Sequence, residues 1–140
     1  MNYNAAFFGL FENVFLLLKE EFGEEHALAL FTTLMERGLS KSYGRDFETG
    51  NPFEFERLVG VRDTMVGLKV EFPSVKENEL IYRFHDDPFP NLKGHINSAK
   101  IDDCYMRFKV RYILGPLWDY KTTKHLWNGD KYTEHVIYKR

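Results

Sequence analysis

Apolar side chains recur at helical spacing through the first part of the chain. Residues 4–22 carry such a stripe, and further phenylalanine and leucine side chains lie on the other sides of the same helix. A helix that is apolar on most of its surface is usually buried centrally or lies in an oligomer interface. The pattern therefore predicts a buried first helix that takes part in a homodimer. The stripe consists of Phe7, Leu10, Phe11, Val14 and Leu18.

Two more helices follow, each with a recognisable boundary. Residues 24–37 form the second, and Gly38 is expected to end it. Its inward stripe consists of Ala27, Leu30, Phe31, Leu34 and Met35. The third begins at "NPFE", where Asn51 is a typical N-cap and is followed by proline at the first helical position. We expect the apolar sides of these helices to pack on a sheet formed by the rest of the chain.

After residue 69 the apolar positions change to every second residue, which is typical of a half-buried strand. Val70 and Phe72 are separated by a charged residue, and the same alternation returns from Leu80 to Phe84. The pattern predicts a β-hairpin that turns near residues 77–78. Pro73 cannot donate a backbone hydrogen bond, so the first strand should be an edge strand or contain a bulge.

The pattern of residues 100–114 fits two structures. Apolar residues at 106, 108, 110 and 112 alternate with basic residues, and this alternation slightly favours a strand. A helical stripe is also present, formed by Ile101, Tyr105, Phe108 and Tyr112. The residue pattern alone leaves both alternatives open.

The end of the chain predicts a second hairpin around Asn128-Gly129, a dipeptide typical of tight β-turns. We expect Gly129 to adopt a positive φ and Leu126 to pair with Asp130, because this register separates an aromatic face from a polar face. The polar face is either a solvated surface or one wall of a pocket. Its members are Lys121, Thr123, His125, Lys131, Thr133 and His135.

Composition and charge exclude several classes of partner. A chain of 140 residues is expected to form one domain, residues 1–140. The net charge of -2, from 19 basic and 21 acidic residues, argues against a nucleic-acid partner. The apolar run near the N-terminus is too short to cross a membrane. Cys104 is the only cysteine, so no intramolecular disulfide can form, and we expect a cytoplasmic protein.

Several short motifs follow one another in the second half of the chain. They are Asp87-Pro88-Phe89, Gly115-Pro116, Tyr120, the "KTTK" run at residues 121–124, Gly129-Asp130 and Tyr132. In this order they resemble the L-2-amino-thiazoline-4-carboxylic acid hydrolase-like family. The resemblance implies three N-terminal helices, a hairpin, a helical stretch over residues 100–114 and a final hairpin.

The resemblance also implies hydrolysis of a small heterocycle, but two positions differ from the family pattern. The family has cysteine where this chain has Asp87 and Thr133. A carboxylate can still act as a base, whereas a threonine hydroxyl is a poor replacement for a thiolate. The chain therefore fits either a hydrolase-like protein or a binding domain that has lost the family's cysteines.

The candidate catalytic residues are His85 and Asp87 in "FHDDPF". A histidine beside carboxylates can act as an acid-base pair, although aspartate before proline is also an ordinary turn former and helix cap. The side chains expected to orient the substrate are Lys121, Thr123, Thr133, His135 and Cys104. The five histidines lack metal-ligand spacing, and no cofactor motif is present, so we expect neither a metal nor a cofactor.

These observations predict an α+β fold in which N-terminal helices pack on an antiparallel sheet of two β-hairpins. The leading hypothesis for function is a small cytoplasmic hydrolase acting on a compact polar heterocycle or amide. The alternative is a non-catalytic small-molecule-binding domain, and a third is an interaction protein that dimerises through its first helix. An enzyme needs a polar cluster inside a cavity, whereas a binding domain needs a mostly apolar and aromatic cavity.

Overall fold

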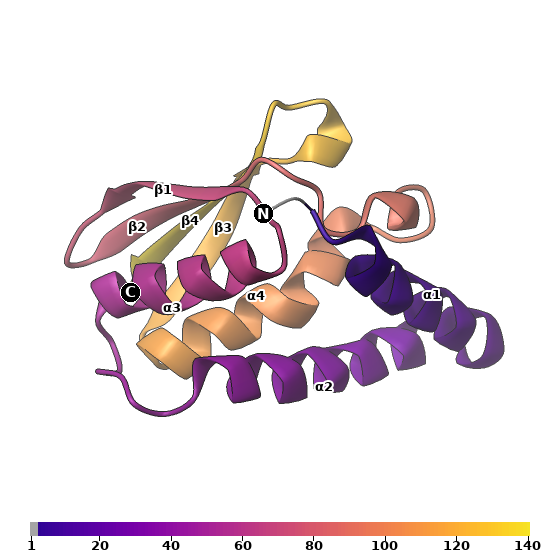
Figure 1. Cartoon of the computed structure of the whole chain (residues 1–140), viewed down its shortest axis with the longest axis horizontal. Coiled ribbons are helices and arrows are strands. Elements are labelled where there is room, and N and C mark those ends of the chain that lie inside the picture. The colour runs from indigo at the N-terminus through magenta and orange to yellow at the C-terminus, as the bar shows by residue number, and fades with distance from the viewer. Residues whose placement is uncertain (1–2) are drawn as a thin grey trace.

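The computed structural model describes residues 3–140 and has the predicted α+β architecture (Figure 1). The elements in chain order are α1 (Ala5–Phe22), α2 (Glu24–Tyr43), α3 (Pro52–Met65), β1 (Val70–Val75), β2 (Glu79–Phe84), η1 (Pro90–Leu92), α4 (Ser98–Leu114), β3 (Trp118–Lys124), η2 (Leu126–Asn128) and β4 (Thr133–Lys139). The strands form an antiparallel sheet in the order β1-β2-β4-β3. The two predicted hairpins therefore lie side by side and are joined through β2 and β4.

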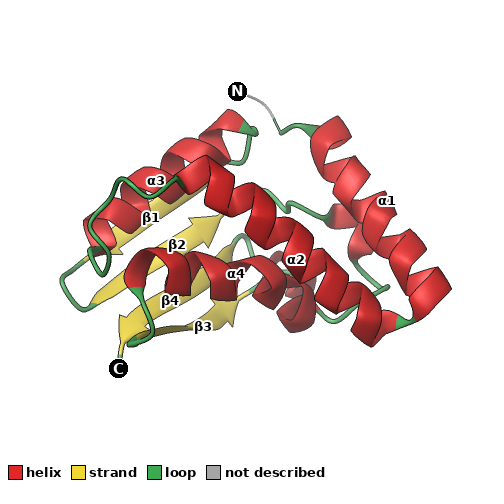
Figure 2. Cartoon of the chain, turned by 90° about the horizontal axis from the view of Figure 1, so that it is seen from below, coloured by secondary structure: helices red, strands yellow, loops and turns green. Residues whose placement is uncertain are grey.

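The helices form two layers on one side of this sheet (Figure 2). α3 and α4 pack directly against the strands, and α2 packs on α4 from the side away from the sheet. α1 packs beside α2 and extends past the end of the sheet. The core of the protein consequently lies between the sheet, α4 and α2.

α1 is joined to the loop around η1 along its whole length. The buried carboxylate of Glu12 accepts hydrogen bonds from the backbone and side-chain nitrogens of Asn91, at 2.6 and 3.0 Å. The Tyr3 hydroxyl and the Lys19 ammonium donate to backbone carbonyls of the same loop. A buried carboxylate is costly unless it is hydrogen-bonded, so these contacts allow Glu12 to lie inside.

The buried face of α1 differs from the predicted stripe. Phe8 and Phe15 are buried, whereas Phe11 and Val14 are only half-buried. Apolar side chains occur on nearly all sides of this helix, so its periodicity does not determine which side faces the core.

α2 is longer than predicted, and only part of its predicted stripe, namely Ala27, Phe31 and Met35, is buried. Leu30 and Leu34, predicted to be buried, are each 40% exposed. The helix continues through Gly38, because an apolar repeat at every fourth residue extends past the glycine, whose cost is at most about 1 kcal/mol. The buried residues of this repeat are Ala27, Phe31, Met35, Leu39 and Tyr43.

Residues 98–114 form helix α4, as the family resemblance implies and contrary to the alternating pattern. Asn97 caps the helix by accepting hydrogen bonds from the amides of Ala99 and Lys100, at 2.9 and 3.3 Å. α4 lies between the sheet and α2, so side chains on two of its sides are buried. Apolar residues on both sides of a helix can imitate the alternation of a strand.

The first hairpin and the start of α3 confirm their predictions. β1 is an edge strand, and its pairing with β2 is irregular between Glu71 and Ser74, the segment that contains Pro73. Asn51 caps α3 by accepting a hydrogen bond from the amide of Phe53 at 2.9 Å. Local chemistry was sufficient to predict both features.

The predicted register of the second hairpin is wrong. Tyr120 pairs with Ile137 and Thr122 with His135, and the connection spans residues 125–132 with η2 inside it. The prediction relied on separating a polar face from an aromatic face within this hairpin alone. In the structure β4 lies between β2 and β3, and His135 of the predicted polar face is fully buried. The predicted positive φ of Gly129 is confirmed, with a value of 88°.

We expect Gly129→Val to destabilise the protein by about 1–2 kcal/mol, because a β-branched residue resists the left-handed conformation. Urea unfolding followed by circular dichroism measures this change. A free energy of unfolding equal to that of the wild type would contradict the requirement for a glycine in this turn.

We expect Gly38→Ala to stabilise the protein by about 0.5–1 kcal/mol, because alanine favours the helix interior. A Cβ at this position meets no atom within 4 Å, so the added methyl group causes no clash. The same unfolding assay tests the variant, and a loss of stability would mean that the helix is interrupted at residue 38.

Candidate functional site

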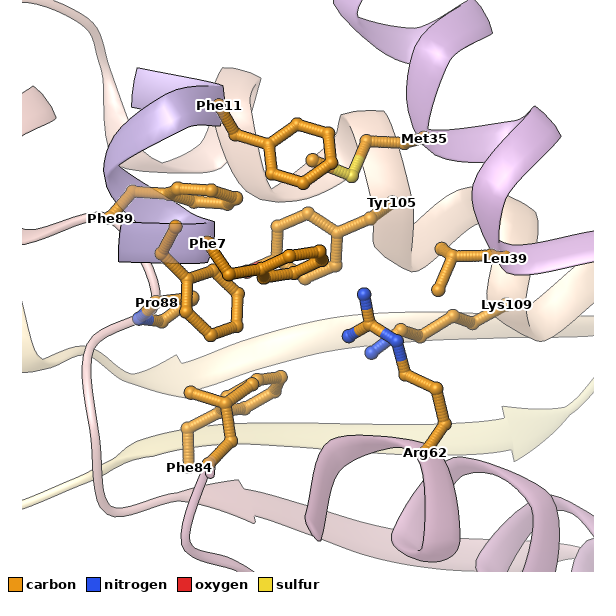
Figure 3. A pocket seen from close by; sticks show the side chains of 12 residues that line it. Phe7, Phe11, Met35, Leu39, Arg62, Phe84, Pro88, Phe89, Tyr105 and Lys109 are labelled. Carbon is orange, nitrogen blue, oxygen red and sulfur yellow. The ribbon is translucent and has the colours of Figure 1, made fainter. Parts of the chain in front are cut away.

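A small cavity with a largely aromatic lining lies where α1, α2, α3, α4 and β2 meet (Figure 3). Its volume is about 20 Å³. The lining residues are Phe7, Phe8, Phe11, Met35, Leu39, Arg62, Leu68, Phe84, Pro88, Phe89, Tyr105 and Lys109. Such a lining matches the usual composition of ligand pockets, which are mostly apolar with a few polar groups.

The aromatic wall is built from segments that lie far apart in sequence. Phe89, in the loop before η1, contacts Phe8 and Phe31 edge to face, with ring centroids 5.8 and 5.7 Å apart. Phe8 also contacts Phe7, with centroids 5.1 Å apart. Edge-to-face contacts of this kind stabilise the arrangement beyond the burial of the ring area.

One end of the cavity is cationic. Arg62 and Lys109 both direct their nitrogen atoms toward this end, from α3 and α4 respectively (Figure 3). The carboxylate of Asp63 lies 3.3 Å from the Arg62 guanidinium and 3.7 Å from the Lys109 ammonium. The Tyr82 hydroxyl donates to Asp63 and accepts a hydrogen bond from Lys109 at 3.0 Å.

Lys109 lies within a cage of aromatic rings. Its side chain is only 2% exposed, and burial lowers its pKa to about 8. The ammonium nitrogen lies 5.2, 5.4 and 5.2 Å from the ring centroids of Tyr82, Phe84 and Tyr105. Cation–π attraction partly compensates for the loss of water around a buried ammonium group.

A wider groove adjoins the cavity on the side of the helices. It has a volume of about 540 Å³ and runs between α1, α2 and α3. The side chains that line both spaces are Phe7, Phe11, Met35, Leu39 and Arg62. These side chains therefore separate the aromatic cavity from an open groove.

Tyr105 connects the cavity to a second polar cluster. Its hydroxyl donates to one oxygen of Asp102 at 2.8 Å, and the other oxygen lies 2.8 Å from His125 Nε2. His125 Nδ1 accepts a hydrogen bond from the backbone amide of Trp127 at 3.0 Å. A continuous chain of hydrogen bonds thus runs from the cavity wall to the connection between β3 and β4.

The predicted catalytic residues His85 and Asp87 bind different partners. His85 Nε2 lies 2.8 Å from the carboxylate of Glu71, and both side chains are partly exposed. Asp87 accepts hydrogen bonds from the amide of Phe89, at 2.9 Å, and from the indole of Trp127. Burial raises the pKa of Asp87, and these two hydrogen bonds oppose the rise. Both oxygens of this carboxylate are therefore already engaged.

The residues predicted to orient a substrate lie in several places, and none of them lines the aromatic cavity. Lys121 and Cys104 line a broad open cleft between α2, α4 and β3. Burial raises the pKa of the Cys104 thiol, which opposes formation of a thiolate. Thr123 lies on the surface and donates to Glu134 at 2.6 Å, whereas Thr133 is buried.

His135, another of these predicted residues, is fully buried beneath α4. Its Nδ1 lies 2.9 Å from the hydroxyl of Thr122, and its Nε2 has no hydrogen-bond partner within the described chain. The rings of Tyr82, Phe84 and Tyr120 surround it, with centroids 6.1, 5.8 and 5.7 Å away. Burial lowers the pKa of His135 to about 4, so the imidazole is neutral at pH 7.

The sequence pattern does not reveal the cationic residues of the cavity. In that pattern Lys109 is one of the basic residues that alternate with apolar ones. On a helix, however, it falls between Tyr105 and Ile113 at spacings of four, in the middle of a buried stripe. A lysine in the middle of a buried helical stripe indicates an unusual buried charge. This indication is visible only once the segment is known to be a helix.

Comparisons with known proteins identify the fold alone. No family model matches this chain, and no curated protein matches it. Among solved structures, it is similar to the phenol-responsive sensory domain of the transcription activator PoxR, in a crystal structure with phenol. The TM-score is 0.65 and the identity 14%, and the match covers 98% of this chain and 74% of the other.

Residues 3–140 contain neither a cluster suited to a metal ion nor a helix suited to crossing a membrane. No group of three or more histidine, cysteine, aspartate or glutamate side chains in this range is placed to hold a metal ion. None of the helices described in this range combines the length and the apolar character that crossing a membrane requires.

We expect the free energy of unfolding to fall by about 3 kcal/mol between pH 6.5 and pH 4 through His135 alone. The folded-state pKa of His135, about 4, is below the ordinary value of 6.5, so the unfolded chain binds more protons in this range. Urea unfolding at a series of pH values should show a smaller decline for His135→Phe, which cannot titrate.

His26→Gln is the matched control for this pH series. His26 is an exposed histidine in the first turn of α2, so this variant removes a histidine without disturbing the core. An equal decline in the wild type and His135→Phe would mean that His135 is protonated in the folded state with an ordinary pKa.

Proposed function

We propose that this chain is a non-catalytic binding domain for a small molecule that contains a compact, mostly aromatic ring. The observation that carries the proposal is the cavity itself, in which seven of the twelve lining side chains are aromatic or aliphatic rings and most others are apolar. Such a lining favours an apolar ligand through burial and ring stacking. The similarity to the PoxR phenol-responsive domain supports the proposal by analogy, because that domain is described with phenol.

The size of the cavity requires a rearrangement when a ligand binds. A volume of about 20 Å³ holds roughly one water molecule, whereas a benzene ring fits a cavity of about 150 Å³. The neighbouring groove is large enough, and only side chains separate the two spaces. Met35 is flexible and Phe7 lies on the outer helix α1, so these two side chains are the ones we expect to move.

The hydrolase hypothesis gains less support from the site. Asp87 is held by Trp127 and Phe89, and His85 is paired with Glu71, so neither is placed at the cavity. A general base must reach the proton that it removes, directly or through one water molecule. Binding without catalysis therefore fits the arrangement of these residues better.

The homodimer remains a proposal that rests on exposed apolar side chains. Leu10 and Leu17 of α1 are 63% and 61% exposed, and such residues are costly to leave in water when they form a continuous surface. We expect light scattering at micromolar concentration to give twice the 16.6 kDa mass of one chain. A mass equal to one chain would count against the dimer without affecting the binding proposal.

We expect phenol and toluene to raise the melting temperature and to shift the methyl NMR signals of Met35 and Leu39. A ligand at a hundred times its Kd stabilises the folded state by about 2.7 kcal/mol. Absence of any shift at millimolar concentrations of both compounds would contradict the proposed function.

The variant Gly38→Trp tests whether the ligand uses the groove to reach the cavity. Gly38 lines the groove, and a Cβ added there meets no atom within 4 Å, so a large ring can occupy the groove without disturbing the core. We expect the affinity for toluene to fall by roughly tenfold or more, which corresponds to about 1.4 kcal/mol. Gly38→Ala adds only a methyl group and should bind toluene as the wild type does.

A further inference from the structure

The cationic end of the cavity has more positive than negative charge. Arg62 and Lys109 both line the cavity, and their side chains are 17% and 2% exposed. Asp63, which has no exposed surface, is the carboxylate that contacts both of them. One carboxylate cannot neutralise two cations, so a positive charge remains beside the aromatic wall whenever Lys109 is protonated.

The other groups around Lys109 do not remove this excess. Tyr82 and Tyr105 are buried, and burial raises their pKa values, so both hydroxyls stay neutral. His135 is neutral because burial lowers its pKa. Asp102 already interacts with His125 and with the Tyr105 hydroxyl.

An anion would satisfy this end of the cavity. A carboxylate accepts two parallel hydrogen bonds from a guanidinium group, and a buried ammonium group gains a partner in the same place. A neutral ligand would instead leave the positive charge without a counter-charge in an apolar environment, which is unfavourable. The rest of the lining is aromatic, which favours a ring as the remainder of the ligand.

We propose that the ligand is a small aromatic carboxylate, with its carboxylate between Arg62 and Lys109 and its ring against Phe7, Phe84 and Phe89. This inference rests on the proposed function, because it assigns the class of molecule that the same cavity binds. It also assigns a specificity role to Arg62 and Lys109, which belong to different helices and lie 47 positions apart in the sequence.

The first experiment compares benzoate with benzamide, a neutral molecule of nearly the same shape, by isothermal titration calorimetry at pH 7. We expect benzoate to bind at least roughly tenfold more tightly, which is the range of a charge-assisted hydrogen bond. Arg62→Gln and Lys109→Met should each remove most of this preference while retaining binding of toluene.

Arg57→Gln is the matched control. Arg57 lies on the same helix as Arg62 and lines the outer groove, where it is exposed and paired with Glu54. Its replacement should leave the preference for benzoate unchanged. An equal loss in Arg57→Gln and Arg62→Gln would indicate general attraction of anions to the surface and would overturn the proposal.

A pH series on the wild type provides a second test that needs no change in the core. Lys109 loses its proton as the pH rises through about 8, so benzoate affinity should fall between pH 7 and pH 9.5. Benzamide affinity should stay constant over the same range. The fall should be absent in Lys109→Met, and this series keeps the proposal testable if that variant does not fold.

The outcomes distinguish failure of the proposed binding function from failure of the assignment of an anionic ligand. If toluene binds but benzamide and benzoate bind equally, the assignment of an anionic ligand is overturned and the binding function stands. If neither toluene nor benzoate binds, both are overturned. If benzoate binds tightly and both Arg62→Gln and Lys109→Met leave its affinity unchanged, the anion binds elsewhere and the inference is wrong.

Discussion

The buried carboxylate of Asp63 is the interaction on which the arrangement of α3, α4 and β2 depends. It has no exposed surface, yet it contacts Arg62, Lys109 and the Tyr82 hydroxyl, each on a different element. Its backbone carbonyl also accepts a hydrogen bond from Leu68 at 2.9 Å, in the turn that follows α3. Loss of one partner in such a buried cluster typically costs about 3–5 kcal/mol, because it leaves a charge uncompensated.

The same cluster explains why a polar group can exist inside a largely apolar core. Each charge in it has an opposite charge or a hydrogen-bond partner nearby, and aromatic rings surround the one lysine. The arrangement fixes the positions of α3 and α4 on the sheet, because the Asp63 carboxylate must contact Arg62, Lys109 and the Tyr82 hydroxyl at the same time. The position of the aromatic cavity follows from this, since Arg62 and Lys109 form one of its ends.

The sequence predicted those parts of the fold that depend on local chemistry. Asn51 as a helix cap, Pro73 at an edge strand and Gly129 at positive φ each follow from the properties of one residue. The register of β3 and β4 was wrong because it depends on β2, which pairs with the other side of β4. No pattern within the last hairpin contains that information.

The candidate site was not predictable for a related reason. Lys109 looked like a surface residue until its segment was placed as a helix between the sheet and α2. The residues predicted from their chemical reactivity, such as His85 and Asp87, are paired with groups outside the cavity. Reactive residue types are common on surfaces, whereas convergence of distant residues in a cavity requires the tertiary structure.

The attachment of α1 to the loop around η1 has a consequence for how the cavity can open. Glu12, Tyr3 and Lys19 all bond to that loop, and Phe7 and Phe89, one from each segment, face the same cavity. Separating α1 from the loop would break every one of these hydrogen bonds, whereas a displacement of both segments as a rigid body would break none. We therefore expect residues 3–22 and 88–95 to behave as one cooperative unit, whose amide protons exchange with solvent together in a subglobal opening.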